Sequence, residues 1–301
     1  MNNYLIYGWK VQTDFEFLQL PVWDRKEGEQ ADLTIAAGEI AEEFEGKRLV
    51  FSEINSEKSL FSNYMVRSVI EGGNKITYEI LPGANLKYVN SYFVGWMMAI
   101  VAFQKGQTAV HCSALSDENG VIMISGESGA GKSTLCAHFL ERGFDFMADD
   151  IAVTEIKDGK AIAYPTFPYQ KLCRNVVDAK GLDYRNLIYV DEDKDKFLVP
   201  VMNRFNDKPT SVNCLIFLAR NNKEEVICRE LSGIEKFIIC NKATFFNRLF
   251  GNENMPAKAG ALCLDLASTI RAYVISRPDG IDTQSEVNRL ADEIADGRFA
   301  G

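Results

Sequence analysis

Short runs in which hydrophobic and polar residues alternate dominate the first third of the chain. Turn signals such as Pro82-Gly83 separate these runs. Alternation with a period of two, bounded by such turns, is typical of half-buried β-strands. We expect strands at Tyr4–Lys10, Leu33–Ala36, Tyr64–Val69 and Ile76–Leu81.

A longer apolar segment follows at Tyr92–Phe103. At about a dozen residues it is shorter than the ~20 that a bilayer requires, so we expect a buried helix. No basic segment followed by an apolar run opens the chain, and no signal peptide is expected. The sequence predicts a β-rich N-terminal region, residues 1–105, that ends in this helix, and a second domain, residues 106–301.

The second domain mixes strand and helix patterns. Single strands are expected at Thr108–Leu115, Val121–Ile124 and Phe144–Ala148, and strand pairs at Ile151–Ile156 with Ala161–Tyr164 and at Asn213–Ala219 with Glu225–Glu230. Helices are expected at Lys132–Arg142 and after the capping-box residues Ser232 and Thr283. Because hairpins predominate over β-α-β alternation, we predict an α/β (α+β) fold with a mixed or antiparallel sheet.

A glycine-rich segment joins an expected strand to an expected helix in this domain. Its residues are Gly126, Glu127, Ser128, Gly129, Ala130, Gly131, Lys132, Ser133 and Thr134. They match G-x-x-x-x-G-K-[ST], a phosphate loop (P-loop) whose backbone N–H groups surround the phosphates of a nucleotide. In this pattern Lys132 reaches the β- and γ-phosphates and the Ser133 hydroxyl ligates Mg²⁺. The sequence therefore predicts a binding site for a nucleoside triphosphate.

Two acidic residues, Asp149 and Asp150, follow the strand after the loop helix. Phosphoryl transfer needs one carboxylate to hold Mg²⁺ and another to orient or deprotonate the attacking hydroxyl. Neighbouring side chains on a strand point in different directions, so the pair can divide these tasks. Which aspartate is the base is left open, and a pair of exposed turn acids is the alternative.

His111 precedes these residues, on the strand expected to pair with the loop strand. It either contacts phosphate or an aspartate, or has a structural role. The catalytic candidates are Asp150, Asp149, Lys132 and His111, and the candidate metal ligands are Ser133 and Asp149.

Composition narrows the list of partners. The chain is 47% hydrophobic and 25% charged, with a formal net charge of −9, which argues against nucleic acid or an anionic membrane as partner. Its 7 cysteines are widely spaced and include no C-x-x-C. Buried, reduced thiols in a cytoplasmic protein explain them better than zinc sites or a disulfide framework. A homo-oligomer is left open.

Residues 110–155 resemble the catalytic core of the HPr kinase/phosphorylase family. The shared parts are, in order, a His-containing strand, a hairpin, the phosphate loop, a helix ending in Arg-Gly and an Ala-Asp-Asp strand. The resemblance implies a P-loop fold related to ATP-type phosphoenolpyruvate carboxykinase. It also implies an ATP- and Mg²⁺-dependent enzyme that phosphorylates a serine hydroxyl. The site residues would be His111, Lys132, Ser133, Asp149 and Asp150.

Outside this core the chain lacks the Glu-Ile-Arg-Gly signature of true HPr kinases. Its layout looks closer to the HPr-kinase-like proteins found beside peptide-modification genes, including kinases of lasso-peptide precursors. The stretches that carry this second resemblance are His111–Ala114, Tyr164–Leu172 and Lys196–Pro200. It implies a serine in a protein or peptide as the phosphoryl acceptor.

The loop-rich middle section offers further groups. A second cation on the transferring phosphate would come from Lys171, Arg174, Lys196 or Arg204. The aromatic residues Tyr164, Phe167 and Tyr169 would stack on adenine or shape an acceptor groove, with core packing as the alternative.

We therefore expect a cytoplasmic P-loop serine kinase that uses ATP and Mg²⁺. One alternative is a kinase of a small-molecule hydroxyl. The other is a nucleotide-sensing binding module with little or no catalysis, which the missing signature favours.

Overall fold

The computed structural model describes residues 1–41, 51–191, 195–251 and 254–299. The chain forms two compact units. Unit 1 consists of Met1–Gln107, Thr166–Met202 and Arg248–Asn254, and unit 2 of Thr108–Pro165, Asn203–Asn247 and Met255–Gly301. The chain first leaves unit 1 close to the expected boundary at residues 105–106, and it returns to unit 1 twice.

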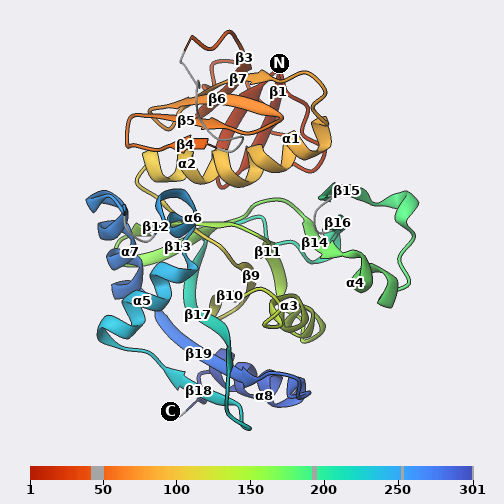
Figure 1. Cartoon of the computed structure of the whole chain (residues 1–301), viewed down its shortest axis with the longest axis vertical. Coiled ribbons are helices and arrows are strands. Elements are labelled where there is room, and N and C mark those ends of the chain that lie inside the picture. The colour runs from red at the N-terminus through yellow and green to blue at the C-terminus, as the bar shows by residue number, and fades with distance from the viewer. Residues whose placement is uncertain (42–50, 192–194, 252–253, 300–301) are drawn as a thin grey trace. The chain divides into compact units, whose positions relative to one another are not determined.

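Unit 1 is built on a mixed seven-stranded sheet. In spatial order its strands are β1 (Asn2–Ile6), β2 (Trp9–Thr13), β3 (Leu33–Ala37), β7 (Lys75–Ile80), β6 (Val66–Glu71), β5 (Lys58–Ser62) and β4 (Phe51–Glu53). A helical run lies along one face of this sheet (Figure 1), formed by α1 (Leu86–Tyr92), a π-helical turn (Phe93–Met97) and α2 (Met98–Gln104). The unit also holds β14 (Tyr169–Cys173), α4 (Arg174–Ala179), β15 (Ile188–Asp191) and β16 (Lys196–Pro200), whose strands form a small sheet.

The first expected strand, Tyr4–Lys10, is a hairpin. Tyr7 and Gly8 both have positive φ values, 54° and 75°, and they form the two-residue turn between β1 and β2. Positive φ at both central positions is the geometry of a type I′ turn, which matches the twist of the paired strands. Tyrosine is unusual at the first of these positions, where asparagine, aspartate and glycine are common. The turn was therefore not predicted.

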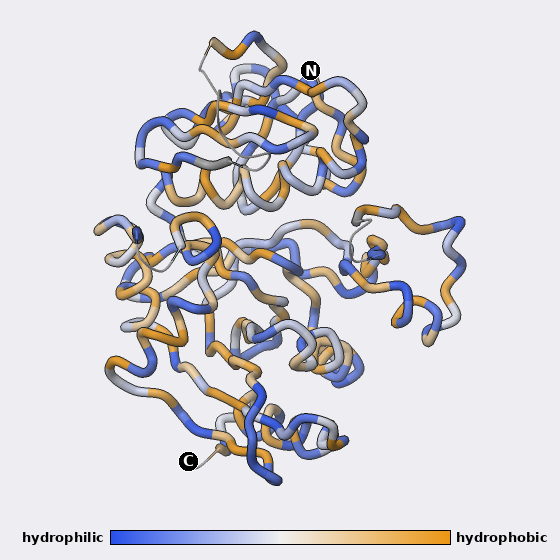
Figure 2. Tube along the Cα trace, in the orientation of Figure 1, coloured by the Kyte–Doolittle hydropathy of each residue, from blue (hydrophilic) through white to orange (hydrophobic). Residues whose placement is uncertain are grey.

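The helical run is longer than the sequence predicts. Leu86–Gln104 is 19 residues long and contains an 18-residue window with a mean hydropathy of 1.2, so by length and composition it is able to cross a membrane. Buried core helices pass the same test, and 61% of this segment is buried inside the structure. Figure 2 shows mostly hydrophobic positions along it with some polar ones, and every residue of α2 is buried, as in a helix that is apolar on all sides. The prediction that the segment is too short to span a bilayer is therefore wrong, and the prediction of a buried helix agrees with its burial.

Unit 2 contains a nine-stranded sheet. Its strands are β8 (Thr108–Val110), β9 (Ser113–Asp117), β10 (Gly120–Gly126), β11 (Asp145–Ala148), β12 (Ala152–Lys157), β13 (Lys160–Tyr164), β17 (Thr210–Asn221), β18 (Ile227–Glu230) and β19 (Arg271–Pro278). The order is β11-β9-β10-β17-β13-β12-β8, and β19 pairs with both β17 and β18. Parallel pairs (β10–β17, β17–β19) lie beside antiparallel ones, which confirms the predicted α/β fold with a mixed sheet.

Helices cover both faces of this sheet, because its central strands are apolar on both sides. They are α3 (Lys132–Glu141), α5 (Gly233–Ala243), α7 (Ala257–Thr269) and α8 (Gln284–Ala295), and α6 (Phe246–Phe250) is a short connection. On one face, Ile122 and Ile124 of β10 pack in a core with α3 and α8. On the other, Val121 and Met123 share a core with α5 and α7. The sheet that carries the loop is therefore the buried middle layer of three.

The expected strand pair Asn213–Ala219 with Glu225–Glu230 is wrong. β19 lies between the two strands, parallel to β17 and antiparallel to β18. The sequence analysis predicted neither β19 nor α7. Local patterning cannot distinguish a hairpin from two strands that a third, distant strand separates.

Both predicted helix starts, Ser232 and Thr283, are correct, although neither side chain makes a capping hydrogen bond. At α8 the carboxylate of Asp282 accepts instead from the backbone N–H of Gln284, at 3.1 Å.

The structure agrees with the prediction that the cysteines are reduced thiols and mostly buried. All seven are free, and five are buried. Burial raises the pKa of Cys214 and of Cys263 to about 12, which keeps these thiols protonated and unreactive near neutral pH.

Gly126, at the end of β10, pairs with Leu218 of β17 and has no space for a side chain. A Cβ atom there would lie 2.1 Å from the carbonyl oxygen of Leu218, and φ is +141°. We expect Gly126→Ala to lower the free energy of unfolding by about 2–5 kcal/mol, measured by urea denaturation. Gly159→Ala is the matched control, because Gly159 has φ +72° and no atom within 4 Å of an added Cβ; it should cost about 1–2 kcal/mol. Equal losses in the two variants would show that the close approach is unimportant.

Candidate functional site

The glycine-rich segment forms a loop between the carboxyl end of β10 and the start of α3. Gly131 is the N-cap of α3 and has φ +105°, and no side chain caps the helix. The first turn contains no acidic residue, and Ser133 and Thr134 are exposed. The orphan N–H groups and the positive end of the helix dipole therefore face solvent, which is the arrangement that binds phosphate at helix N-termini.

Lys132 lies across this loop. Its Nζ donates to the carbonyl oxygens of Gly126 and Glu127, each at 2.8 Å. The side chain thus folds back toward the space that a phosphate group would take. Carbonyl oxygens are weaker partners for an ammonium than phosphate oxygens are, so a bound phosphate can replace them.

His111 is not within a strand, which corrects the expectation that Thr108–Leu115 is continuous. The chain breaks at His111 and Cys112, between β8, which pairs with β12, and β9, which pairs with β10. The backbone of His111 is nevertheless held at both ends: its N–H donates to Ala243 O, and its carbonyl accepts from Ser125 Oγ, both at 2.7 Å. The break places His111 beside the last residues before the loop.

The His111 ring contacts Asp150. Nδ1 lies 2.7 Å from the Asp150 carbonyl oxygen and 3.4 Å from Oδ1 of the same residue. A carbonyl only accepts hydrogen bonds, so Nδ1 carries the proton and a neutral ring has its lone pair on Nε2. The ring therefore positions Asp150 through its backbone.

Asp150 has φ +71°, a conformation that costs a non-glycine residue of the order of 1–3 kcal/mol. Backbone strain of this kind occurs at sites where a side chain must point in a particular direction. The Asp150 side chain is 44% exposed and so accessible to a ligand.

Asp149 is held by a neighbouring strand. Ser113 Oγ donates to Asp149 Oδ1 at 2.7 Å, and Ser113 is the strand partner of Ile124 in β10. Burial raises the pKa of the Cys112 thiol, and the negative charge of Asp149 adds to the rise. The structure therefore brings His111, Asp149 and Asp150 together at the strand edge where the loop begins.

Within the described ranges, no three His, Cys, Asp or Glu side chains form a metal-binding group. Mg²⁺ needs no such group, because it is commonly held by one or two side-chain oxygens together with substrate phosphates and waters. The hydroxyl of Ser133 and the carboxylate of Asp149 are donors of this kind, so they fit Mg²⁺ bound with a nucleotide.

The cations proposed from sequence as a second clamp are divided between the two units, and the loop belongs to unit 2. Lys171, Arg174 and Lys196 belong to unit 1. There Arg174 pairs with Asp195 and lies over the rings of Tyr184 and Phe197. Arg204 belongs to unit 2, but its Nη1 lies near Gly143, beyond the C-terminal end of α3. That is about 15 Å, the length of the helix, from the loop.

The aromatic residues predicted to stack on adenine or to shape an acceptor groove also belong to two different units. The buried Tyr164 has a structural role in unit 2: its hydroxyl accepts from Lys157 Nζ at 2.6 Å and donates to Glu155 at 2.8 Å. Phe167 and Tyr169 lie in unit 1.

Two arginines that the sequence analysis did not consider do lie beside the loop. Arg220 Nη2 donates to the carbonyl oxygen of Gly129 at 3.2 Å. A Cβ atom on Gly131 would lie 3.4 Å from Arg277 Nη1. Arg220 lies near the end of β17, just beyond the predicted strand Asn213–Ala219, and Arg277 lies near the end of β19, a strand that was not predicted.

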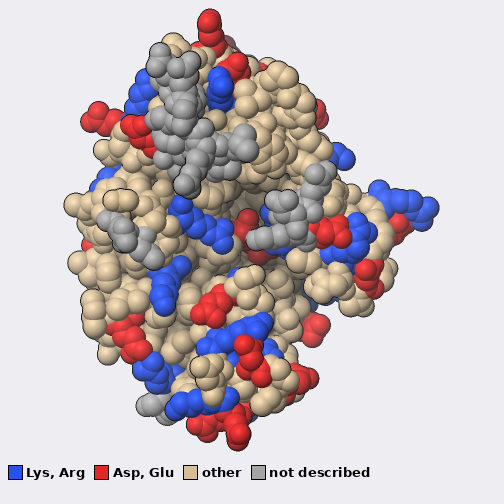
Figure 3. Space-filling view, in the orientation of Figure 1, with Lys and Arg blue, Asp and Glu red and all other residues tan. Residues whose placement is uncertain are grey.

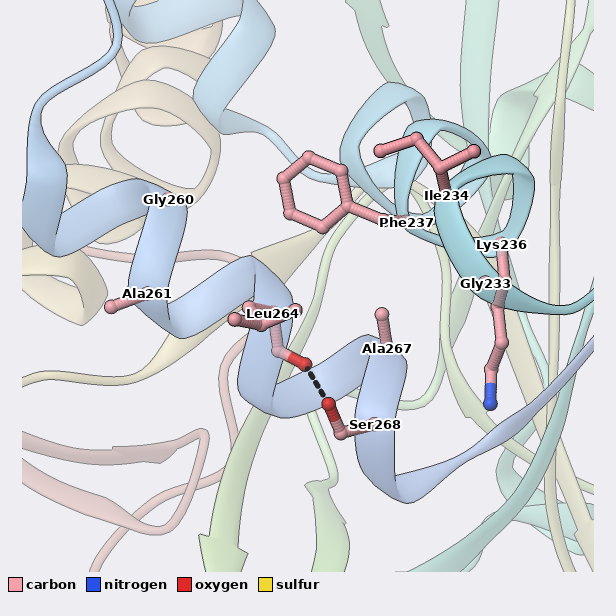
Figure 4. A pocket seen from close by; sticks show the side chains of 9 residues that line it. All are labelled: Gly233, Ile234, Lys236, Phe237, Gly260, Ala261, Leu264, Ala267 and Ser268. Atoms are coloured by element: carbon pink, nitrogen blue, oxygen red, sulfur yellow. Dashed lines mark hydrogen bonds between the residues drawn. The ribbon is translucent and has the colours of Figure 1, made fainter.

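Unit 2 has a second concave feature on the opposite face of its sheet (Figure 4). A groove of about 640 Å³ lies between α5 and α7, lined by Gly233, Ile234, Lys236, Phe237, Gly260, Ala261, Leu264, Ala267 and Ser268. None of its lining residues belongs to the loop or to the acidic pair. Elsewhere, Figure 3 shows basic and acidic side chains interspersed on the face drawn, without an extended basic surface.

The fold and the site thus have the parts of a phosphate-binding loop in a mixed α/β sheet. A scan against protein-family models and a search of curated proteins found no match. Among solved structures the chain is similar to "Structure of the Hpr(Ser) kinase/phosphatase from Coxiella burnetii", with a TM-score of 0.32 and 14% sequence identity. The match covers 63% of this chain and 94% of that chain. A likeness this low carries no argument about activity.

Proposed function

We propose that the protein is a P-loop kinase that transfers the γ-phosphoryl group of ATP to a hydroxyl, a serine of a protein or peptide. The observation that carries the proposal is the grouping of His111, Asp149 and Asp150 at the start of a solvent-facing loop that contains Lys132. The fixed aspartates and the exposed helix N-terminus together offer a place for a triphosphate and for a base.

In this proposal the loop N–H groups and Lys132 bind the β- and γ-phosphates and stabilise the charge on the transferring group. Ser133 and Asp149 would hold Mg²⁺, which neutralises phosphate charge when bound. Asp150 would accept the proton of the attacking hydroxyl, with His111 fixing its orientation. Asp150 is assigned as base because its side chain is exposed, whereas Asp149 is hydrogen-bonded to Ser113.

The acceptor class and a cytoplasmic location are parts of the same proposal. The serine acceptor rests on the sequence resemblance to kinases of peptide precursors. A cytoplasmic location accords with the seven free thiols, since reduced cysteines are typical of that compartment.

The test is incubation with γ-labelled ATP, Mg²⁺ and the products of neighbouring genes, followed by mass-spectrometric mapping of the modified residue. We expect phosphoserine in a protein or peptide. Label in a small molecule alone would favour a metabolite kinase instead. Tight ATP binding without transfer to any acceptor would favour a nucleotide sensor, and both results would contradict the proposal.

A further inference from the structure

Two arginines occupy equivalent positions at the ends of neighbouring strands. Arg220 in β17 and Arg277 in β19 are direct strand partners. β10, β17 and β19 are parallel, so the arginines and the phosphate loop share one edge of the sheet. Ligands of α/β sheets bind outside the carboxyl ends of the strands, which is this edge.

The strand order places the arginines and the aspartates on opposite sides of the loop strand. β9 and β11, the second of which leads to Asp149, lie on one side of β10, and β17 and β19 lie on the other. A triphosphate in the loop would therefore have carboxylates on one flank and guanidinium groups on the other.

Distances to the loop support direct contact with a ligand there. Arg220 Nη2 is hydrogen-bonded to Gly129 O, as described above, and this guanidinium also pairs with Asp279. Arg277 Nη1 lies against Gly131, the residue that caps the loop helix. Arg220 is thus engaged with the loop backbone, and Arg277 faces the end of the loop from which the helix N–H groups project.

The two arginines differ in their partners, because Arg220 forms an ion pair with Asp279 and Arg277 forms a hydrogen bond to a neutral group. Arg277 donates to the neutral amide oxygen of Gln284 at 3.0 Å, and in the described part of the chain it forms no ion pair. It is half-buried, and its strand partner is a second cation. A partly desolvated cation beside a like charge is unfavourable unless an anion compensates it. Although the chain has a net charge of −9, the guanidinium of Arg277 adds a positive charge beside the loop that is unpaired among the described residues.

We infer that Arg277 is a ligand of the nucleotide phosphates, binding them from the side of the loop opposite Asp149. Its guanidinium fork suits two phosphate oxygens at once, which a lysine at this position would not match. Arg220 holds Gly129 and adds positive charge. The inference rests on the proposed nucleotide site and adds a residue to it.

The test is calorimetric titration of the full chain with MgATP, comparing the wild type with Arg277→Gln and Arg277→Lys. Loss of a charge-assisted phosphate contact should weaken binding about 10- to 100-fold in Arg277→Gln. Arg277→Lys should recover part of the affinity, since it restores the charge without the fork. The matched control is Arg271→Gln at the other end of β19, where Arg271 pairs with Glu230 on the surface; its affinity should stay within about twofold of the wild type.

Circular dichroism establishes that each variant is folded, and should Arg277→Gln unfold, Arg277→Lys provides the comparison. Wild-type affinity in both Arg277 variants would overturn the inference and leave the proposed function standing. A wild-type protein that binds no nucleotide would overturn the proposed function, and the inference with it.

Discussion

Lys132→Met should abolish phosphoryl transfer while leaving the fold intact. Lys132 would stabilise the charge on the transferring group, and removal of one such group from an active site typically costs about 10²–10³-fold in rate. Lys132 Nζ donates to the loop carbonyls of Gly126 and Glu127, and methionine preserves the length of the apolar stem, so the sheet and α3 should be unaffected. Transfer of radiolabelled phosphate from γ-labelled ATP measures the effect.

Lys160→Met is the matched control for this variant. Lys160 is exposed at the β12–β13 turn, and its replacement removes the same charge from the same unit. We expect wild-type transfer in the control and equal unfolding temperatures for both variants. Full activity in Lys132→Met would reject the assignment of the loop.

Replacement of both Asp149 and Asp150 by asparagine should likewise abolish transfer. The amide oxygen of asparagine can still accept the Ser113 hydrogen bond, and asparagine tolerates the positive φ of position 150. The substitution therefore removes charge and basicity with little effect on the backbone. Loss of a general base alone typically costs about 10²–10⁴-fold.

Asp145→Asn serves as the control, because Asp145 is an exposed residue at the start of β11, the strand that leads to the acidic pair. The double variant should keep its affinity for ATP measured without Mg²⁺, since the loop and Lys132 are unchanged. Transfer at the wild-type rate by the double variant would exclude the acidic pair from the chemistry. A folded double variant that no longer binds ATP would show that the pair acts in nucleotide binding instead.

Local sequence signals predicted those parts of unit 2 that depend on local geometry. The β9–β10 hairpin, the loop, α3 and the β12–β13 hairpin all have turn or glycine signals next to strongly patterned segments. The mixed character of the sheet followed from these hairpins. The starts of α5 and α8 were correct too, because Ser and Thr mark helix starts even where their side chains make no capping bond.

Non-local pairing was the main source of error. β19 joins β17 through contacts between residues more than 50 positions apart, which no local period reveals. The break at His111 has the same origin: β8 and β9 pair with different strands, although no glycine or proline separates them in the sequence. The hairpin turn at Tyr7-Gly8 was missed for a different reason, because its first residue is not a usual turn residue.

The sequence likewise predicted some residues of the candidate site and not others. The loop and the acidic pair have a recognisable spacing, and the structure groups them with His111. Arg220 and Arg277 have no motif, since they meet only where two parallel strands end beside the loop. The middle-section cations were chosen for their position in the sequence, and three of the four belong to unit 1. Spatial proximity across a sheet edge is the information that the sequence alone did not contain.

The most direct test of the central claim is a crystal structure of the protein with Mg²⁺ and a non-hydrolysable ATP analogue. We predict a triphosphate within the loop of residues 126–134, with Lys132 moved from the Gly126 and Glu127 carbonyls to the phosphates and with Asp149 and Asp150 facing the γ-phosphate. A loop without ligand in the presence of excess nucleotide, with Lys132 still on the carbonyls and both carboxylates turned to bulk solvent, would contradict the account.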